Sequence, residues 1–154
     1  MRIALFQPDI PQNTGNILRL AACFGIEIDI IGPAGFIFNN KKFKRASMDY
    51  IKYTKYERHL DWESYKKWSK NKNYRVILLT TKSKKNYSSF VFKNNDILLF
   101  GQESSGVPKK IHKDVHDRLT IPMVNEVRSL NISSAAAIVT AEALRQLRLL
   151  NIND

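Results

Sequence analysis

Short, nearly continuous runs of apolar residues alternate along the chain with longer segments in which apolar residues recur at helical spacing. A strand that is covered on both faces shows such a continuous run, so these runs predict buried strands. The predicted strands are RIALFQP (2–8), which ends at a proline, IEIDIIGP (26–33), YRVILLTT (74–81), DILLFG (96–101) and RLTIPM (118–123), with IKYTKYERHL (51–60) as a further candidate.

Helices are predicted between these strands. The segment NTGNILRLAACFG (13–25) has four apolar residues at helical spacing, from Ile17 to Phe24, and Gly25 as a C-terminal stop. The other predicted helices are NNKKFKRASMDY (39–50, a short basic helix and turn), DWESYKKWSKNK (61–72, with Asp61 as N-cap), PKKIHKDVHD (108–117) and NISSAAAIVTAEALRQLRLL (131–150). Strands that alternate with helices predict an α/β fold with a mostly parallel sheet flanked by helices.

Three polar loops follow predicted strands, and these loops are the first place to look for chemistry. They come after Phe6, after Phe100 and after Met123. In parallel α/β sheets, ligands bind beyond the carboxyl ends of the strands. We therefore expect the three loops to contribute to one site.

The length and the apolar content limit the class of protein. The chain has 154 residues, and we expect residues 1–154 to form a single domain. One cysteine, Cys23, lies among apolar residues, which predicts a buried thiol and excludes an internal disulfide. No apolar run approaches the ~20 residues of a membrane span, and the N-terminal run is too short for a signal peptide. These features predict a soluble cytoplasmic protein.

The net charge of +11 indicates a polyanionic partner, for which nucleic acid is the usual case. The abundance of Lys, Asn and Ile is also what AT-rich coding produces, so part of the excess is explained without a partner. Tyr, Trp and Lys interleave between Tyr50 and Trp68. This segment is either an RNA-facing patch or an amphipathic cover over the core.

The first polar loop, QPDIPQNTGNILR, leads into a predicted helix. Asn13, Thr14 and Asn16 are candidate caps of that helix. Arg19 is expected near the open end of the helix and off its apolar face, where a cation is unfavourable. An anionic partner such as a phosphate would account for Arg19, and an ordinary surface arginine is the alternative.

The second loop, LLFGQESSGVP (98–108), holds a carboxylate between two glycines. It matches neither the dinucleotide-binding glycine pattern nor the P-loop, so diphosphate binding is disfavoured. Glu103 is suited to accept hydrogen bonds from a ribose or from backbone amides, or to face a cation. A plain strand-to-helix turn is the alternative.

The third region begins TIPMVNEVRSLN and continues into the C-terminal helix. Asn131 and the serines after it crowd the helix start more than capping requires. The alanines 135–137 offer a smooth face for another element, although helix propensity alone explains them. The backbone through 121–123 and 129–130 is able to hydrogen-bond an adenine edge. A double cap by Ser129 and Asn131 is the simpler alternative.

The histidines do not predict a metal site. His112 and His116 are four residues apart on one predicted helix, but no third ligand accompanies them, and His59 lies far away in the sequence. We therefore expect no metal.

Three segments, NTGNILR, LLFGQESSGVP and IPMVNEVRSLNISSAAAIVTAEALRQ, together resemble the motifs of the SPOUT superfamily of trefoil-knot methyltransferases. Their order and spacing match the branch that methylates ribose 2′-hydroxyls of RNA, and the resemblance covers essentially the whole chain. The resemblance implies a deep C-terminal trefoil knot, which is a rare exception to the usual chain connections. It also implies S-adenosyl-L-methionine as methyl donor and a homodimer with the active site at the interface.

The resemblance assigns site residues by position. It implies that the adenosine side of the cofactor is lined by Leu79, Gly101, Ile121, Ser129 and Leu130. The residues that it implies for catalysis are Arg19, Glu103, Ser129 and Asn131.

Arg19 would stand beside the reacting hydroxyl. A guanidinium keeps its proton and is a poor base, so we expect Arg19 to hold the adjacent phosphate and to stabilise a developing alkoxide. The proton acceptor stays open between that phosphate and Glu103. Lys42, Lys44 and Arg45, with Arg19, are the expected contacts to the anticodon stem-loop of a tRNA.

The segments DIPQNTGNILR, KRASMDY and LLTTKS favour the subgroup that acts on the wobble ribose, cytidine or modified uridine 34, of leucine tRNA. The resemblance also implies that a chain with little sequence beyond its motifs, and with no separate RNA-binding domain, agrees with that subgroup. Methylation of another tRNA or rRNA ribose is the alternative within the family. An RNA-binding module without catalysis is the alternative outside it, and an unrelated nucleotide-binding enzyme is disfavoured by the missing glycine pattern.

Overall fold

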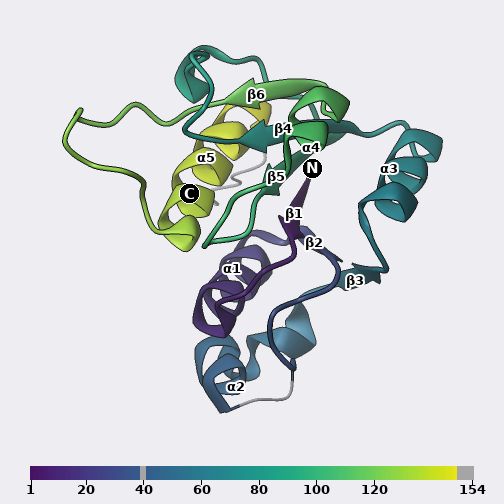
Figure 1. Ribbon diagram of the computed structural model, residues 1–154. Coiled ribbons are helices and arrows are strands. Elements are labelled where there is room, and N and C mark those ends of the chain that lie inside the picture. Colours follow the sequence, from purple (N-terminus) through teal and green to yellow (C-terminus); the bar gives the residue numbers. More distant parts are fainter. Residues whose placement is uncertain (39–40, 149–154) are drawn as a thin grey trace.

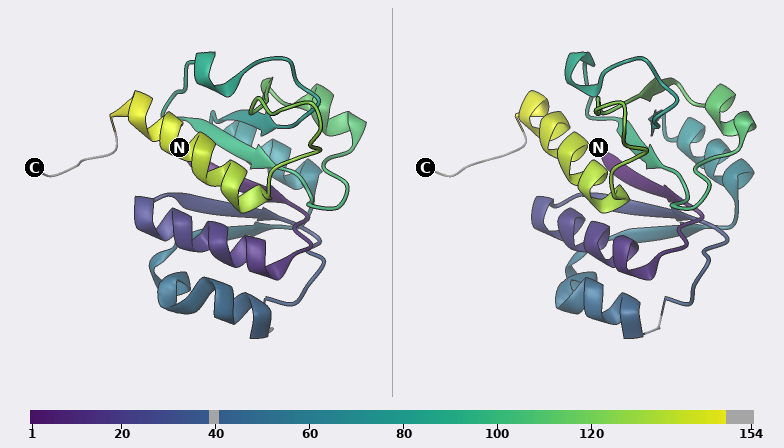
Figure 2. Two further views of the ribbon diagram at one scale, coloured as in Figure 1. Left: turned by 90° about the vertical axis from the view of Figure 1, so that its left-hand side faces the viewer. Right: turned by 60° about the vertical axis from the view of Figure 1, so that its left-hand side comes forward.

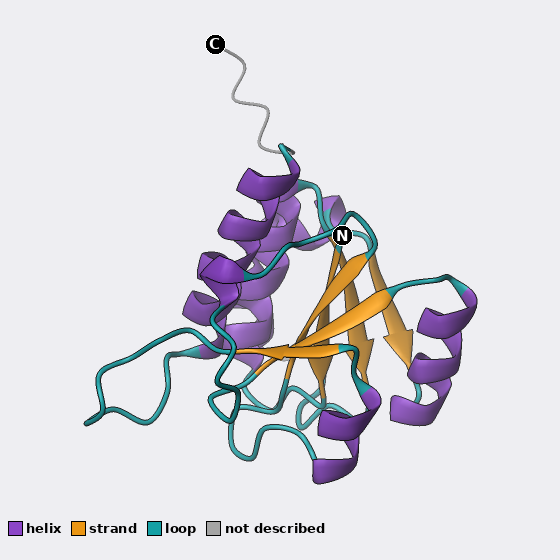
Figure 3. Cartoon of the chain, turned by 90° about the horizontal axis from the view of Figure 1, so that it is seen from above, coloured by secondary structure: helices purple, strands orange, loops and turns teal. Residues whose placement is uncertain are grey.

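Six parallel strands form one sheet in the order β3–β2–β1–β5–β4–β6. Figure 3 shows the strands in orange with helices on both sides. The computed structural model describes residues 1–38 and 41–148, without the side chains of residues 42, 44, 46, 48 and 49. The strands are β1 (Arg2–Phe6), β2 (Glu27–Ile31), β3 (Tyr56–His59), β4 (Arg75–Leu79), β5 (Asp96–Phe100) and β6 (Asp117–Leu119).

Helices connect the strands and cover the sheet (Figure 1). The α-helices are α1 (Pro11–Phe24), α2 (Lys41–Ser47), α3 (Trp62–Asn71), α4 (Lys109–Asp114) and α5 (Ile132–Leu147). Short 3-10 helices span Met48–Tyr53 (η1) and Tyr87–Ser89 (η2). In the described part of the chain, no helix combines the length and the apolar character needed to cross a bilayer.

Alternate residues of a strand face opposite sides of the sheet, and each side has its own layer of helices. Ile3 and Leu5 of β1 join an apolar cluster with α1, α2 and α5. Ala4 and Phe6 join a second cluster with α3 and α4. Figure 2 shows α1, α2 and α5 on one side of the sheet and α3 and α4 on the other.

The predicted α/β fold with a parallel sheet is confirmed, and a strand is present in each predicted segment. Two segments differ in their ends. Of RLTIPM only Arg118 and Leu119 belong to β6, which begins one residue earlier, at Asp117. The strand stops ahead of Pro122, which has no N–H to donate to a ladder. Residues 51–60 divide between the end of η1 and the short strand β3. The trefoil knot and the single-domain organisation stay predictions.

The start of α1 differs from the prediction. The helix begins at Pro11, and no side chain caps its N-terminus, so Asn13, Thr14 and Asn16 are not caps. Proline suits the first helical position because it has no N–H that needs a partner, and this starts the helix earlier than the polar run indicated. Arg19 therefore lies in the middle of α1, and the argument from an unfavourable helix dipole does not hold.

The prediction of a buried Cys23 is also wrong, because the residue is exposed. The core-facing stripe of α1 passes through Ile17, Leu18 and Ala21, while 37% of the surface of Phe24 is exposed to solvent. The stripe is rotated because α1 packs against α2 and α5 as well as the sheet, and this rotation turns Cys23 outward.

Aromatic residues of α3 pack on the sheet. Tyr65 is fully buried and Trp62 nearly so. The rings of Tyr65 and Trp68 are stacked with centroids 5.5 Å apart, and Trp68 stacks in turn on Tyr74 at 5.4 Å. For α3, this packing supports the amphipathic cover rather than the RNA-facing patch.

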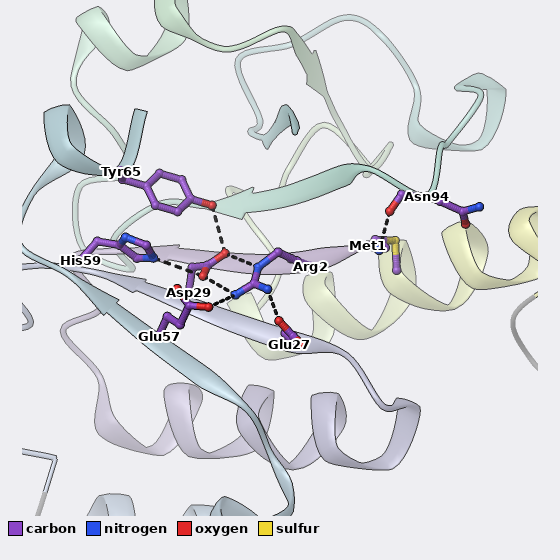
Figure 4. A network of polar contacts seen from close by, with 8 residues as sticks. All are labelled: Met1, Arg2, Glu27, Asp29, Glu57, His59, Tyr65 and Asn94. Carbon is purple, nitrogen blue, oxygen red and sulfur yellow. Dashed lines mark hydrogen bonds and ion pairs between the residues drawn. The ribbon is translucent and has the colours of Figure 1, made fainter. Parts of the chain in front are cut away.

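A buried ion pair joins β1 to β2 on the same side as α3 (Figure 4). Arg2 donates from Nε to Oδ2 of Asp29 at 2.9 Å and from Nη2 to Oδ1 at 2.7 Å. Asp29 is completely buried, and the hydroxyl of Tyr65 also donates to its Oδ2 at 3.3 Å. Burial and the charge of Asp29 raise the pKa of Tyr65, which keeps this donor protonated. The carboxylate is thus paired and hydrogen-bonded, as a buried charge requires.

We expect Arg2→Met to lower the free energy of unfolding by about 3–5 kcal/mol, because it leaves the Asp29 carboxylate buried without its counter-ion. Urea denaturation followed by circular dichroism measures this change. The double variant Arg2→Met/Asp29→Leu should recover most of the loss, since neither charge is then buried alone. Lys110→Met removes an exposed ion pair with Glu63 and should change little. Equal losses in the single and double variants would contradict this account.

Candidate functional site

A pocket of about 540 Å³ opens at the edge of the sheet where β4, β5 and β6 end. Its walls come from the ends of these strands, the loop after β5 and the segment that leads into α5. The residues predicted to line a cofactor all lie on this wall: Leu79, Gly101, Ile121, Ser129 and Leu130. A volume of this size suits a ligand as large as a nucleoside with a side chain.

The loop 101–106 is closed on itself by two backbone hydrogen bonds. Gln102 N donates to Gly106 O at 2.9 Å, and Gly106 N donates to Gln102 O at 2.7 Å. Gly101 packs so closely on this turn that a Cβ atom at its position would lie 2.7 Å from the carbonyl carbon of Gly106. Gly101 therefore has no room for a side chain, and the tight loop presents Glu103 at the pocket wall.

Glu103 reaches across to the chain that leaves β1. Its Oε2 accepts a hydrogen bond from the backbone N–H of Asp9 at 3.0 Å, and its Oε1 accepts one from Asn13 Nδ2 at 3.3 Å. Of the options left open by the sequence, the described structure uses Glu103 as an acceptor of a backbone amide and a side-chain amide.

Asn131 links the third loop to the same centre. Its Oδ1 caps α5 by accepting from Ser133 N at 2.9 Å, which is the capping role that the sequence left open for Asn131 as the simpler alternative. Its Nδ2 donates to Asn13 Oδ1 at 3.0 Å. Asn13 therefore bridges Glu103 and Asn131, and the three loops that follow β1, β5 and β6 meet at one buried amide.

Sequence reasoning missed this bridging role of Asn13, because it assigned the residue to a helix cap. A signal was present in the chain: if Pro11 is the first helical residue, Asn13 falls within the first turn, too late to cap it. An asparagine there needs other partners, because side-chain amides are seldom buried without them.

Charged groups also line the pocket. Lys82 and Arg128 bring positive charge to its wall, and His112 lies with them. Burial, together with the charges of Lys82 and Arg118, lowers the pKa of His112 and favours its neutral form. In contrast, burial and a neighbouring carboxyl group raise the pKa of Glu103.

Among the residues predicted to contact RNA whose side chains the structure describes, Arg19 and Arg45 do not line this pocket within one copy of the chain. Arg19 is exposed on α1, with its guanidinium carbon 5.0 Å from the ring centroid of Tyr50. Arg45 is exposed on α2. Lys42 and Lys44 also belong to α2, but their side chains lie outside the described part of the structure.

One cluster has the residue types of a metal site. Ligand atoms of Asp29, Glu57 and His59 lie within 4.8 Å of one another. The guanidinium of Arg2 is inserted among them and pairs with both Asp29 and Glu57, the latter at 3.4 Å. The cluster is therefore explained by its ion pairs with Arg2.

A parallel α/β sheet with one end of its strands closed by three loops around a nucleoside-sized pocket defines a protein that binds a small cofactor or substrate there. The motifs that form this pocket are those that match a known family. The chain belongs to the SpoU rRNA Methylase family, which it matches over residues 1–141.

Relatives resemble the chain over nearly its full length. A tRNA (cytidine(34)-2′-O)-methyltransferase of Beijerinckia indica subsp. indica is 46% identical over 144 residues, which cover 94% of this chain and 90% of the relative. A solved structure, described as giving insight into the 2-OH methylation of C/U34 on tRNA, is 35% identical. It superposes with a TM-score of 0.91, covering 96% of this chain and 95% of that one. The predicted RNA methyltransferase family is thereby confirmed.

The predicted cofactor, S-adenosylmethionine, is also confirmed for the family. An AdoMet-bound rRNA methyltransferase from Sinorhizobium meliloti is 25% identical with a TM-score of 0.87, and the match covers 95% of this chain and 56% of that one. The pocket fits this group in kind. Leu79, Ile121 and Leu130 offer apolar walls for a purine, while Glu103 and Asn131 add polar groups on the same wall.

We expect Gly101→Val to weaken binding of S-adenosylmethionine at least about tenfold, because its side chain must displace the backbone of Gly106 from the pocket wall. Isothermal titration calorimetry measures the affinity, and circular dichroism confirms that the variant is folded. Gly25→Ala is the matched control, since it puts a side chain on a residue with φ of 64° outside the pocket. It should lose stability but not affinity. Unchanged affinity in Gly101→Val would refute the assignment.

Proposed function

We propose that the protein methylates the 2′-hydroxyl of the ribose at wobble position 34, cytidine or modified uridine, of leucine tRNA. The observation that carries the proposal is the 46% identity, over 94% of the chain, to a tRNA (cytidine(34)-2′-O)-methyltransferase. The similarity to the solved structure associated with C/U34 methylation supports the same substrate position. Such a role would be exercised in the cytoplasm, by residues 1–154 acting as one catalytic domain.

Different pocket residues hold different parts of the methyl donor. S-adenosylmethionine supplies, when bound, a methyl group already activated by its sulfonium. Leu79, Gly101, Ile121, Ser129 and Leu130 enclose its adenosine part. Glu103 shapes the pocket or the ribose contact, and Ser129 and Asn131 orient the ribose and the cofactor, so that the enzyme contributes mainly by positioning.

Arg19 serves the acceptor side of the reaction. It holds the phosphate next to the reacting ribose and stabilises the alkoxide that develops as the hydroxyl loses its proton. A guanidinium is a poor base, so the proton passes to that phosphate or to Glu103. Ser129 and Asn131 complete the set of residues around the hydroxyl.

A homodimer with the active site at the interface would bring Arg19 to the pocket. Within one copy, Arg19 does not line the pocket. The segment ahead of α5 exposes Val124 and Val127, and α5 exposes Ile138, which are apolar residues suited to burial against a second copy. We therefore assign Arg19 to the pocket of the partner subunit.

The basic residues of α2 are the proposed contacts to the RNA backbone. Lys42, Lys44 and Arg45 contact phosphates of the anticodon stem-loop, in keeping with the net charge of +11. Flipping the wobble base out costs little, since the anticodon loop is single-stranded.

The proposal is tested by methyl transfer from labelled S-adenosylmethionine to tRNA from a strain that lacks this gene. Nuclease digestion and mass spectrometry locate the product. We expect a 2′-O-methyl group at position 34 of leucine tRNA. A methyl group on another ribose would keep the family and overturn the substrate. Binding of the cofactor and of tRNA without transfer would instead favour the RNA-binding module.

We expect Arg19→Ala to lower kcat by about 100-fold or more, the usual loss for a group that stabilises developing negative charge. Affinity for S-adenosylmethionine should stay largely unchanged, because the proposed role of Arg19 is toward the substrate phosphate and the developing alkoxide rather than toward the cofactor. Arg19→Lys should recover only part of the rate, since it keeps the charge but not the planar fork. Lys70→Ala, on the exposed side of α3, is the control. Normal turnover in Arg19→Ala would refute the role.

Mixing Arg19→Ala with Gly101→Val tests whether the site is shared. A mixed dimer combines the intact pocket of one copy with the intact Arg19 of the other, so mixing two nearly inactive proteins should restore activity. Activity that stays at the level of the separate variants, in a mixture shown to exchange subunits, would contradict the shared site.

A further inference from the structure

Asp9 holds a position beside Glu103 that the reaction described above does not use. It lies between β1 and α1, and its Oδ2 accepts a hydrogen bond from Ser104 Oγ at 2.5 Å. Gly35 packs so closely over it that a Cβ atom at Gly35 would lie 2.9 Å from the Cβ atom of Asp9. Under this cover the other carboxyl oxygen of Asp9, Oδ1, is buried and has no hydrogen-bond partner among the described residues.

The neighbour of this carboxyl group is another carboxyl group. Glu103 Oε2 accepts the backbone N–H of Asp9 at 3.0 Å, and each of the two carboxyl groups shifts the pKa of the other. Among the described residues, neither group forms an ion pair. The pocket that Glu103 faces is also lined by Lys82, Arg128 and His112, and the lowered pKa of His112 favours its neutral form. The side chains that hydrogen-bond to the two carboxyl groups are uncharged: Asn13 of α1 donates to Glu103, and Ser104 of the loop after β5 donates to Asp9.

Two adjacent carboxylates that are partly buried cannot both carry a full charge at low cost. The pKa of Glu103 is raised by burial and by its contact with Asp9, while the same contact lowers the pKa of Asp9. These opposite directions are those of a pair that holds a single proton over a range of pH.

We propose that Asp9 is a positioning residue of the site, which fastens the loop after β5 to the start of α1 by sharing one proton with Glu103. The proton is covalently bound to one carboxyl group and hydrogen-bonded to the other, so the pair carries one negative charge. It supplies the missing partner of the buried Asp9 oxygen. Sharing this proton involves no oxidation or reduction and no leaving group.

The shared proton has two consequences for the site of the proposed function, on which this step rests. It holds Glu103 in the orientation that receives Asn13, and through Asn13 it reaches Asn131 of the third loop. It also means that the carboxyl pair already holds a proton before the reaction begins. Of the two proton acceptors considered above, the substrate phosphate is therefore the one left free.

The dependence on pH follows from the directions of the two pKa values. Because the pKa of Glu103 is raised in the folded protein, protonated Glu103 contributes to the free energy of unfolding. This contribution is fully present below the ordinary glutamate pKa and is lost as the pH rises through the raised pKa. The lowered pKa of Asp9 means that its share is lost as the pH falls through the lowered value. The pair is most stabilising between the two, where it holds one proton.

The first experiment measures Tm of the free protein from about pH 5 to about pH 9 for the wild type and Asp9→Asn. The amide of the variant donates to Glu103 at every pH, so only the wild type should lose this bond as the pH rises. We expect Tm of the wild type to fall relative to Asp9→Asn by about 3 °C, the shift that a tenfold change in the unfolding constant gives in a chain of this size. Glu126→Gln, an exposed acid-to-amide change outside the pocket wall, should run parallel to the wild type. Parallel curves for Asp9→Asn would overturn the proposal.

The second experiment measures the affinity for S-adenosylmethionine by equilibrium dialysis over the same pH range. We expect the affinity of the wild type to fall about tenfold toward high pH while that of Asp9→Asn stays level. Asp9→Ala, which removes the partner altogether, should bind weakly at every pH. Equal pH profiles for the wild type and Asp9→Asn would contradict a positioning role. If no variant binds the cofactor but Tm behaves as expected, the shared proton stands and the proposed function fails.

Discussion

The carboxyl group of Glu103 is held by two elements that are distant in the sequence, and the arrangement of the whole site depends on those hydrogen bonds. One comes from the backbone of Asp9 and the other from Asn13 on α1. Asn13 passes the connection on to Asn131 at the start of α5. Because Asn13 is buried and Glu103 is partly buried, these two groups depend on one another for their hydrogen bonds, and loss of one leaves the other unsatisfied.

The sheet makes this meeting possible. β1 lies next to β5 and runs parallel to it, so the loops that leave the two strands emerge side by side at the same edge. The position of β1 in the middle of the sheet is secured from the other direction by the ion pair between Arg2 and Asp29 on β2. The strand is thus held at its first residue by a charge pair and beyond its last by the polar links to Glu103.

Much of this could be predicted from the sequence, because the strands are apolar runs and the loops between them carry unusual polar residues. The continuous run DILLF predicted β5, and the glycines around Glu103 indicated a tight loop that the structure contains. The position of Arg19 and the exposure of Cys23 could not be derived, because both depend on where α1 begins and how it is rotated against α2 and α5. The partnership of Asn13 with Glu103 joins residues ninety positions apart, which no local pattern reveals.

The two tryptophans of the chain, Trp62 and Trp68, both belong to α3, and neither lines the pocket. The indole N–H of Trp62 donates to Asp114 at 2.9 Å, and Trp68 lies over the guanidinium of Arg2. Intrinsic fluorescence therefore reports on the helical layer behind the sheet, where α3 meets α4 and the buried charge pair. Emission that changes when a ligand enters the pocket would mean that the ligand's influence reaches this layer, and α4 offers a route, because its His112 lines the pocket while its Asp114 holds the indole of Trp62.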